Sequence, residues 1–145
     1  MEKAETNIFV FDRFEVFFKH TDFYGFVHPY NYFEWTSYVR ESFFSQMCGD
    51  FESVLNSSIK MMTAKISADL KGESKFGDRM EARFTTTRIK KVSFEVIIRF
   101  FNKRVQNVVC ETQHTLVFVD SKSEKFTNIP EPIRLAVLKY QEDKK

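Results

Sequence analysis

Hydrophobic and polar positions alternate with a period of two along five separate stretches of the chain. These stretches span residues 8–18, 59–70, 80–85, 93–100 and 108–118. Alternation over such lengths is typical of strands that place one face on a core and the other toward solvent. The last four stretches follow one another through short connections, so we expect them to form an antiparallel meander.

One stretch, residues 31–47, has the period of an α-helix instead. When successive residues are rotated by about 100°, apolar and aromatic side chains cover most of the surface. The wholly polar strip is narrow and holds Glu34, Ser37, Glu41 and Ser45. A surface helix has a broader polar face, so we expect this helix to be buried on most sides. Asn31, with Glu34 three residues later, is typical of a helix N-cap.

The order of these elements is strand, long helix, then four strands. A short helical turn at 51–55 and a terminal helix opened by Pro130 and Pro132 complete it. The sequence therefore predicts an α+β fold in which an antiparallel five-stranded sheet wraps around one long buried helix. We find no repeat or linker and expect a single domain over residues 1–145, with a core from about 8 to 141.

Composition narrows the classes of function. The net charge of +2 and the absence of long like-charge runs argue against a nucleic-acid partner. No stretch is apolar enough for a membrane span or signal peptide, and Cys48 and Cys110 stand far apart, so we expect a cytoplasmic protein with free thiols. Three scattered histidines predict no metal site. Eighteen phenylalanines require a large core or a subunit interface.

Several spaced residues resemble the pattern of the hotdog-fold thioesterases, in particular the branch of 4-hydroxybenzoyl-CoA thioesterase. The first group of matches is Thr21, Asp22, Gly25, Phe26, Val27, Asn31, Tyr32, Trp35 and Arg40. Later matches are Gly77-Asp78, residues 88–94, Val119-Asp120 and Ile129-Pro130. The enediyne-type polyketide thioesterases are also close, because they share Arg40-Glu41, although they usually carry asparagine in place of Asp22. The chain departs from both groups at Tyr24 and at His28-Pro29.

The resemblance implies a hotdog fold and an acyl thioesterase that hydrolyses acyl-CoA or acyl-carrier-protein thioesters to free acid and thiol. It implies no cofactor, since coenzyme A or phosphopantetheine belongs to the substrate. An exposed sheet edge and the excess of phenylalanine predict a homo-dimer or homo-tetramer. Two alternatives stay open, namely a hotdog protein that binds acyl thioesters without turnover and a hotdog enoyl hydratase or dehydratase.

Three side chains are candidates for the chemistry. By the resemblance, Asp22 would be the nucleophile or the general base of hydrolysis, and its alternative role is to cap a turn. Arg40 would polarise the thioester carbonyl. Alternatively, it would form an ion pair with Asp22 or Glu41, or pack its stem against aromatic rings with its head in water. His28 would serve in acid–base chemistry, or be a packed loop residue.

The candidate substrate contacts fall into two groups. The first is the loop and helix start, where Tyr24, Tyr30 and Tyr32 would line the pocket, or pack in the core. Backbone amides after Gly25 and at the helix start would bind an oxyanion. The second group is the basic turn of Arg88, Lys90 and Lys91, which in the family meets CoA phosphates or a carrier protein. The alternative for this turn is a solvated hairpin.

Overall fold

The structure is a computed structural model, and it describes residues 6–142. The strands are β1 (Phe9–Glu15), β2 (Ile59–Leu70), β3 (Arg79–Thr87), β4 (Ser93–Asn102), β5 (Asn107–Asp120) and β6 (Lys125–Phe126). The helices are the 3-10 turn η1 (Phe18–His20), α1 (Tyr30–Met47), α2 (Phe51–Leu55) and α3 (Glu131–Lys139).

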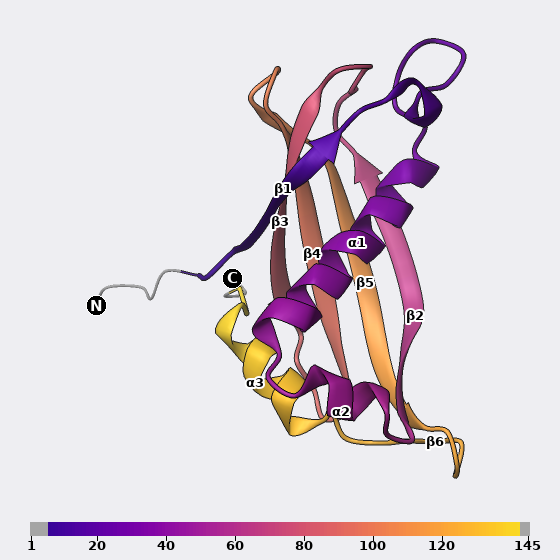
Figure 1. Cartoon of the computed structure of the whole chain (residues 1–145), viewed down its shortest axis with the longest axis vertical. Helices are drawn as coiled ribbons and strands as arrows, with labels where there is room; N and C mark the ends of the chain where they lie inside the picture. Colours follow the sequence, from indigo (N-terminus) through magenta and orange to yellow (C-terminus); the bar gives the residue numbers. More distant parts are fainter. Residues whose placement is uncertain (1–5, 143–145) are drawn as a thin grey trace.

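The strands form one antiparallel sheet in the order β1-β3-β4-β5-β2, and β6 adds two residues beside β5. The sheet curls around α1, which lies across its concave face (Figure 1). The predicted α+β fold, with five strands wrapped around a long helix, is confirmed. The sequence missed β6, because a strand of two residues has no measurable period.

Helix α1 buries one face against the sheet. Tyr32, Trp35, Val39 and Phe43 on this face are buried, and the ring of Phe43 stacks on Phe84 of β3 at 4.2 Å. The opposite face is open, so the expectation that the helix is buried on most sides is wrong for the single chain (Figure 1). None of the described helices is long and apolar enough to cross a membrane.

The start of α1 differs from the prediction. The residue at the N-cap position is Pro29, and Asn31 already lies inside the helix. The buried side chain of Asn31 reaches back instead, and its Nδ2 donates to the carbonyls of His20 at 2.7 Å and His28 at 3.0 Å. The helix starts two residues earlier than a cap at Asn31 requires, so Asn31 ties the preceding loop to the first turn of the helix.

Strand β2 contains a bulge that the sequence did not reveal. The register with β5 shifts between Thr63 and Lys65, which leaves one extra residue on β2. The bulge reverses the side-chain alternation. Thr63 and Ile66 lie opposite buried residues of β5, whereas Met62 lies opposite a residue that is only half-buried. Met62 therefore does not share the helix-facing side with Ile66, contrary to the simple alternation.

Candidate active site

Asp22 lies in the loop between η1 and α1, and its carboxylate shapes that loop. The Oδ1 atom accepts hydrogen bonds from the amides of Tyr24 at 2.9 Å and Phe26 at 3.2 Å. The amide of Asp22 donates to the carbonyl of Phe26 at 2.7 Å, and the amide of Gly25 donates back to the carbonyl of Asp22 at 3.0 Å. Gly25 has a φ of +84°, which a residue with a Cβ adopts only under strain. Asp22 is thus the cap of a tight turn.

The second carboxylate oxygen of Asp22, Oδ2, is not used by the turn. Within residues 6–142, no hydrogen bond reaches Oδ2. Asp22 is half-buried and lines a cavity of about 550 Å³ together with Tyr24, Tyr32, Leu70 and Gly72. The turn therefore fixes one oxygen and leaves the other available at the cavity wall. The two roles considered for Asp22 are compatible, since each uses a different oxygen.

The backbone amides expected to bind an oxyanion already have partners. Those of Val27 and His28 donate to the carbonyls of Ser74 at 2.7 Å and His20 at 2.8 Å. Every other amide from Gly25 to Tyr32 also donates within the chain, except at Pro29, which has none. Because these bonds fold the loop back on itself, the amides do not point into the cavity as free donors. The predicted oxyanion site at Gly25 and the helix start is not formed in the single chain.

The remaining loop candidates separate into two groups. Tyr24 is 79% exposed and lines the cavity of Asp22, whereas the cavity lining includes neither His28 nor Tyr30. His28 is exposed, and its Nδ1 receives only a long contact of 3.4 Å from the amide of Tyr30. Tyr32 is buried, and burial raises the pKa of its phenol to about 12. It forms a neutral wall of the cavity.

A buried polar network supports that wall from behind. The hydroxyl of Tyr32 lies 3.5 Å from Ser74 Oγ, which also accepts from Asn102 Nδ2 at 2.9 Å. Asp78 accepts from Asn102 at 2.9 Å and from Arg104 Nε at 2.7 Å. Burial opposes the charge of Asp78, yet these hydrogen bonds outweigh it and lower the pKa of the carboxyl. The network fixes the β2–β3 connection against α1 and so fixes the cavity.

Arg40 points from α1 toward β2 and β5. Its NH1 donates to Thr63 Oγ1 at 3.0 Å and lies 3.2 Å from Nδ1 of His114. No salt bridge joins it to Asp22 or Glu41 within the described residues, so neither ion pair considered for it is formed. The Nε of Arg40 is buried and has no partner in that part of the chain.

His114 of β5 is the histidine that lies beside Arg40. It is 1% exposed, and burial together with the charge of Arg40 lowers its pKa to about 4. The ring is therefore neutral near pH 7, and Nδ1 accepts from Arg40 while Nε2 stays buried without a partner among residues 6–142. The only available signal was its position on the core-facing side of a strand, which does not identify a partner in the helix.

Arg40 also opens into a separate cavity. This second cavity, of about 550 Å³, is largely apolar and is lined by Phe44, Phe51, Leu55 and Met61 beside Arg40. Arg40 lies ten residues into α1, which places it about 15 Å along the helix axis from the end that carries the Asp22 loop. Within one chain, Asp22 and Arg40 therefore line different cavities.

The basic turn lies at the far end of the sheet. Arg88, Lys90 and Lys91 are exposed in the β3–β4 connection. Arg134 of α3 donates to the carbonyls of Lys90 at 2.7 Å and Lys91 at 3.1 Å. Figure 1 shows α3 at the end of the sheet opposite the Asp22 loop. The turn is thus anchored by its backbone, and its cations are remote from Asp22 in the same chain.

Comparison with solved structures supports the same fold. A 1,4-dihydroxy-2-naphthoyl-CoA thioesterase from Synechocystis matches with a TM-score of 0.81 and 18% identity, covering 91% of this chain and 96% of that one. A Staphylococcus aureus protein in complex with CoA matches with a TM-score of 0.85 and 12% identity, over 100% and 92%. The dynemicin thioesterase matches with a TM-score of 0.83 and 17% identity, over 97% and 100%.

Comparison of sequences gives the family. No protein with a curated description matches the chain. The model of the thioesterase-like superfamily matches residues 16–137, from the end of β1 to α3. That match covers most of the chain and includes both Asp22 and Arg40. The chain therefore belongs to the thioesterase-like superfamily and has the hotdog fold of these enzymes.

Proposed function

We propose that the protein hydrolyses an acyl-CoA thioester to a free acid and CoA, with Asp22 as the reactive group. The observation that carries this proposal is the carboxylate of Asp22. A turn holds it through Oδ1, and in the described part of the chain no hydrogen bond engages Oδ2 at the cavity wall. A carboxylate oxygen held in this way can approach a bound carbonyl without first breaking a hydrogen bond.

Two routes use this oxygen. As a nucleophile, Oδ2 attacks the thioester carbonyl, CoA leaves as the thiolate, and water then hydrolyses the mixed anhydride. As a general base, Oδ2 takes a proton from a water molecule that attacks the same carbonyl, and the thiolate leaves in the next step. Both routes place negative charge on the carbonyl oxygen, and neither requires a metal or a cofactor.

Arg40 of a second copy of the chain is proposed to meet the negative charge on the carbonyl oxygen. β2 is an edge strand of 12 residues, and Met62, Ile66 and Leu70 on it are exposed. An uncovered edge of this length pairs readily with another strand. Antiparallel pairing of two β2 strands about a two-fold axis places the Leu70 end of one beside the Ile59 end of the other. The Asp22 cavity then adjoins the Arg40 cavity of the second copy.

This arrangement predicts a dimer that depends on β2. Ile66 is 42% exposed on the helix-facing side of that strand, so Ile66→Lys should place two like charges near the two-fold axis and shift the protein toward monomer. Light scattering at micromolar concentration measures the change. Leu138→Lys is the matched control, because Leu138 is 46% exposed but lies on α3, away from β2. A monomeric wild type would refute the shared site.

Two features support CoA as the thiol part and an apolar acyl group. The Arg40 cavity is lined mainly by apolar side chains, which suits an acyl chain. The cations of the basic turn suit the phosphates of CoA, and in the proposed pair they belong to the copy that supplies Arg40. The similar Staphylococcus aureus structure holds CoA. A carrier-protein thioester has fewer phosphates for this turn and is the second candidate.

The basic turn has a kinetic signature. Replacing Lys90 and Lys91 together by alanine should raise KM for a CoA ester more than it lowers kcat, since contacts remote from the carbonyl act equally on the ground and transition states. Each exposed contact should contribute about 1 kcal/mol or less, and less at high salt. Replacing Lys122, exposed in the β5–β6 connection, is the matched control. An unchanged KM at low salt would show that the turn does not bind substrate.

A panel of acyl-CoA esters tests the function itself. Release of free thiol supports hydrolysis. Binding without release would favour a non-catalytic acyl-thioester protein, and turnover of an enoyl-CoA would favour a hydratase. The structure gives less support to the hydratase, because its expected histidine, His28, is exposed and does not line the cavity of Asp22.

A further inference from the structure

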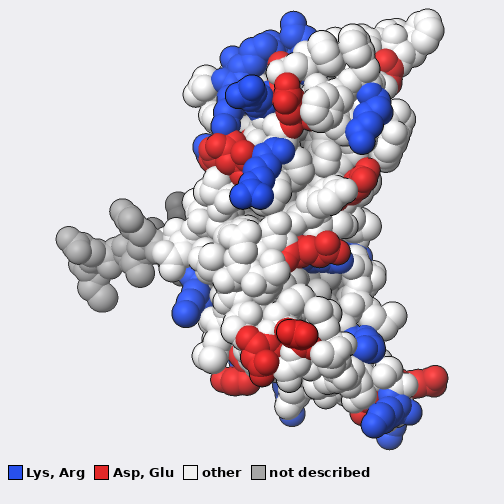
Figure 2. All heavy atoms as spheres, viewed as in Figure 1, with Lys and Arg blue, Asp and Glu red and all other residues white. Residues whose placement is uncertain are grey.

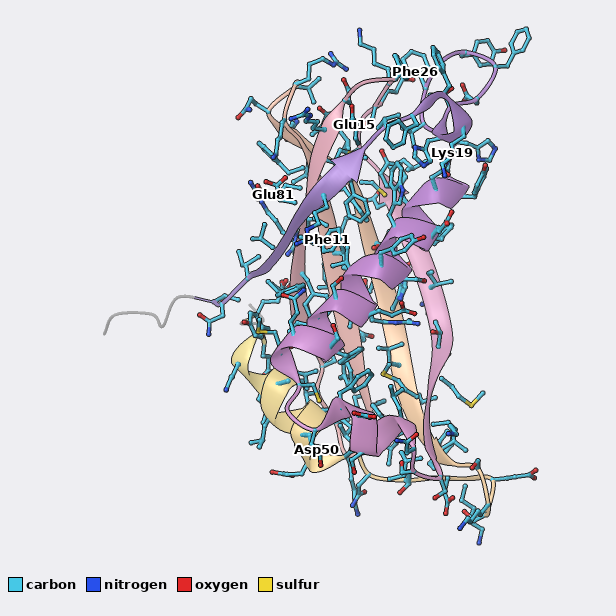
Figure 3. The ribbon with its side chains drawn as sticks, in the orientation of Figure 1. Phe11, Glu15, Lys19, Phe26, Asp50 and Glu81 are labelled. Atoms are coloured by element: carbon cyan, nitrogen blue, oxygen red, sulfur yellow. The ribbon has the colours of Figure 1, made fainter. Side chains whose placement is uncertain are left out.

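A third cavity lies between β1 and the N-terminal half of α1. It has a volume of about 330 Å³ and takes its lining from β1, η1 and α1. Figure 3 labels three of the lining residues, Phe11 and Glu15 on β1 and Lys19 on η1 near the start of α1. None of its lining residues lines the cavity of Asp22. It is therefore a separate concavity, and its volume is sufficient for a small organic molecule.

The walls of this cavity are aromatic. Phe14 and Trp35 are buried, and their ring centroids are 5.6 Å apart. Phe17 and Tyr38 line the same cavity and are each about half exposed. Flat rings on several sides favour a ligand that is itself a ring, because aromatic pairs gain energy from offset and edge-to-face contacts beyond simple burial.

One buried polar group faces this aromatic lining. His20 lines the cavity, is 9% exposed, and its ring packs edge-on against Trp35 at 5.0 Å. Its Nδ1 accepts a hydrogen bond from the amide of Phe17 at 2.9 Å, so the neutral ring carries its proton on Nε2. Burial lowers the pKa of His20, which favours that neutral form. Within residues 6–142, no hydrogen bond engages Nε2.

The rim of the cavity has an excess of positive charge. Arg13 and Lys19 are two exposed cations in the lining, and Glu15 is the single carboxylate there. None of the three belongs to an ion pair among the described residues. Figure 2 shows blue and red side chains around a white area on this upper part of the molecule. Two cations and an N–H donor beside aromatic walls complement a ring that carries an anionic group.

We propose that the cavity between β1 and α1 binds a small aromatic carboxylate. The ring lies against Phe14, Trp35 and Tyr38. The carboxylate accepts from His20 Nε2 and meets the charges of Arg13 and Lys19. This site uses neither Asp22 nor Arg40, and Tyr38 is the one lining residue that it shares with the Arg40 cavity.

Trp35 is the sole tryptophan of the chain, so its fluorescence reports directly on this cavity. Phenylacetate should change the Trp35 emission saturably. Phenylacetamide, which has nearly the same shape without the charge, should bind roughly tenfold more weakly, because hydrogen bonds to a charged group are stronger than neutral ones. Equal affinity for the two compounds would overturn the proposal.

Variants locate the binding. Lys19→Ala and Arg13→Ala should each weaken phenylacetate binding roughly two- to fivefold at low salt. Glu15→Gln should strengthen it, and Lys122→Ala at the far end of the sheet should leave it unchanged. Asp22→Ala should also retain binding, while the Lys19 and Arg13 variants keep the wild-type rate of acyl-CoA hydrolysis. Loss of binding in Asp22→Ala, or wild-type binding in the double variant of Arg13 and Lys19, would place the acid elsewhere and refute the assignment.

Discussion

Replacing Asp22 by alanine should lower kcat for acyl-CoA hydrolysis by a factor on the order of 10² to 10⁴, the usual scale for losing a positioned proton-transfer group. The variant removes the free Oδ2 and also the two hydrogen bonds that Oδ1 accepts from Tyr24 and Phe26. Thiol-release kinetics measure the loss. Circular dichroism and light scattering of the same sample check that the fold and the oligomeric state are intact.

Asp22→Asn separates the chemistry of Asp22 from its structural role. Asparagine keeps one oxygen to cap the turn, but it neither takes a proton nor forms an anhydride. If the carboxylate reacts, this variant should be nearly as inactive as alanine. If the protein follows the enediyne-type thioesterases instead, much activity should survive and Arg40→Ala should be the more damaging change. Full activity in both Asp22 variants, with the fold preserved, would remove Asp22 from the mechanism.

The stability of the protein should fall as pH decreases from about 6.5 to about 4, and His114 should account for a large part of that fall. Burial and the nearby charge of Arg40 lower the pKa of His114 from 6.5 to about 4. Between these values the unfolded chain binds a proton that the native protein does not. The stabilisation is therefore complete above pH 6.5 and is lost progressively below it, by an amount on the order of 3 kcal/mol.

Urea unfolding at fixed protein concentration, from neutral pH to about pH 4, measures this dependence. His114→Gln keeps a neutral acceptor for Arg40 but does not titrate, so its free energy of unfolding should change much less over the same range. His20→Gln is the matched comparison, because burial lowers the pKa of His20 as well, but the nearby charge that adds to this effect belongs to Lys19 and not to an arginine. An unchanged pH dependence in His114→Gln would assign the acid sensitivity to other groups.

The periodic spacing of hydrophobic residues along the chain was sufficient to predict most of the fold. The boundaries of α2 and β2 agree with the structure, as does the end of α1 at Met47, because periodicity depends on neighbours within a few residues. The resemblance carried by Asp22, Gly25 and Arg40 added the family, which is confirmed. Local spacing also predicted that Asp22 is able to cap a turn, and it does.

The tertiary structure decided the partners of the polar groups. Arg40 contacts Thr63 and His114, and 74 residues of the chain separate Arg40 from His114. The Asn31 side chain donates to the carbonyls of His20 and His28 and does not cap the helix. The nearby backbone amides also donate within the chain, so the expected oxyanion site is not formed in the single chain. Hydrogen bonds of this kind depend on which elements meet in space, and no local pattern encodes that.

The same reason explains two further features that the sequence did not predict. The bulge between Thr63 and Lys65 interrupts the register of β2 with β5, and it places Met62 and Ile66 on opposite sides of β2. The cavity beside Trp35 exists only because β1 and α1 leave space between them, although its lining includes residues as far apart in sequence as Phe11 and Tyr38. The sequence by itself determined the elements and indicated Asp22 as the candidate carboxylate. Packing between distant elements determined the cavities and the hydrogen-bond partners of the polar side chains.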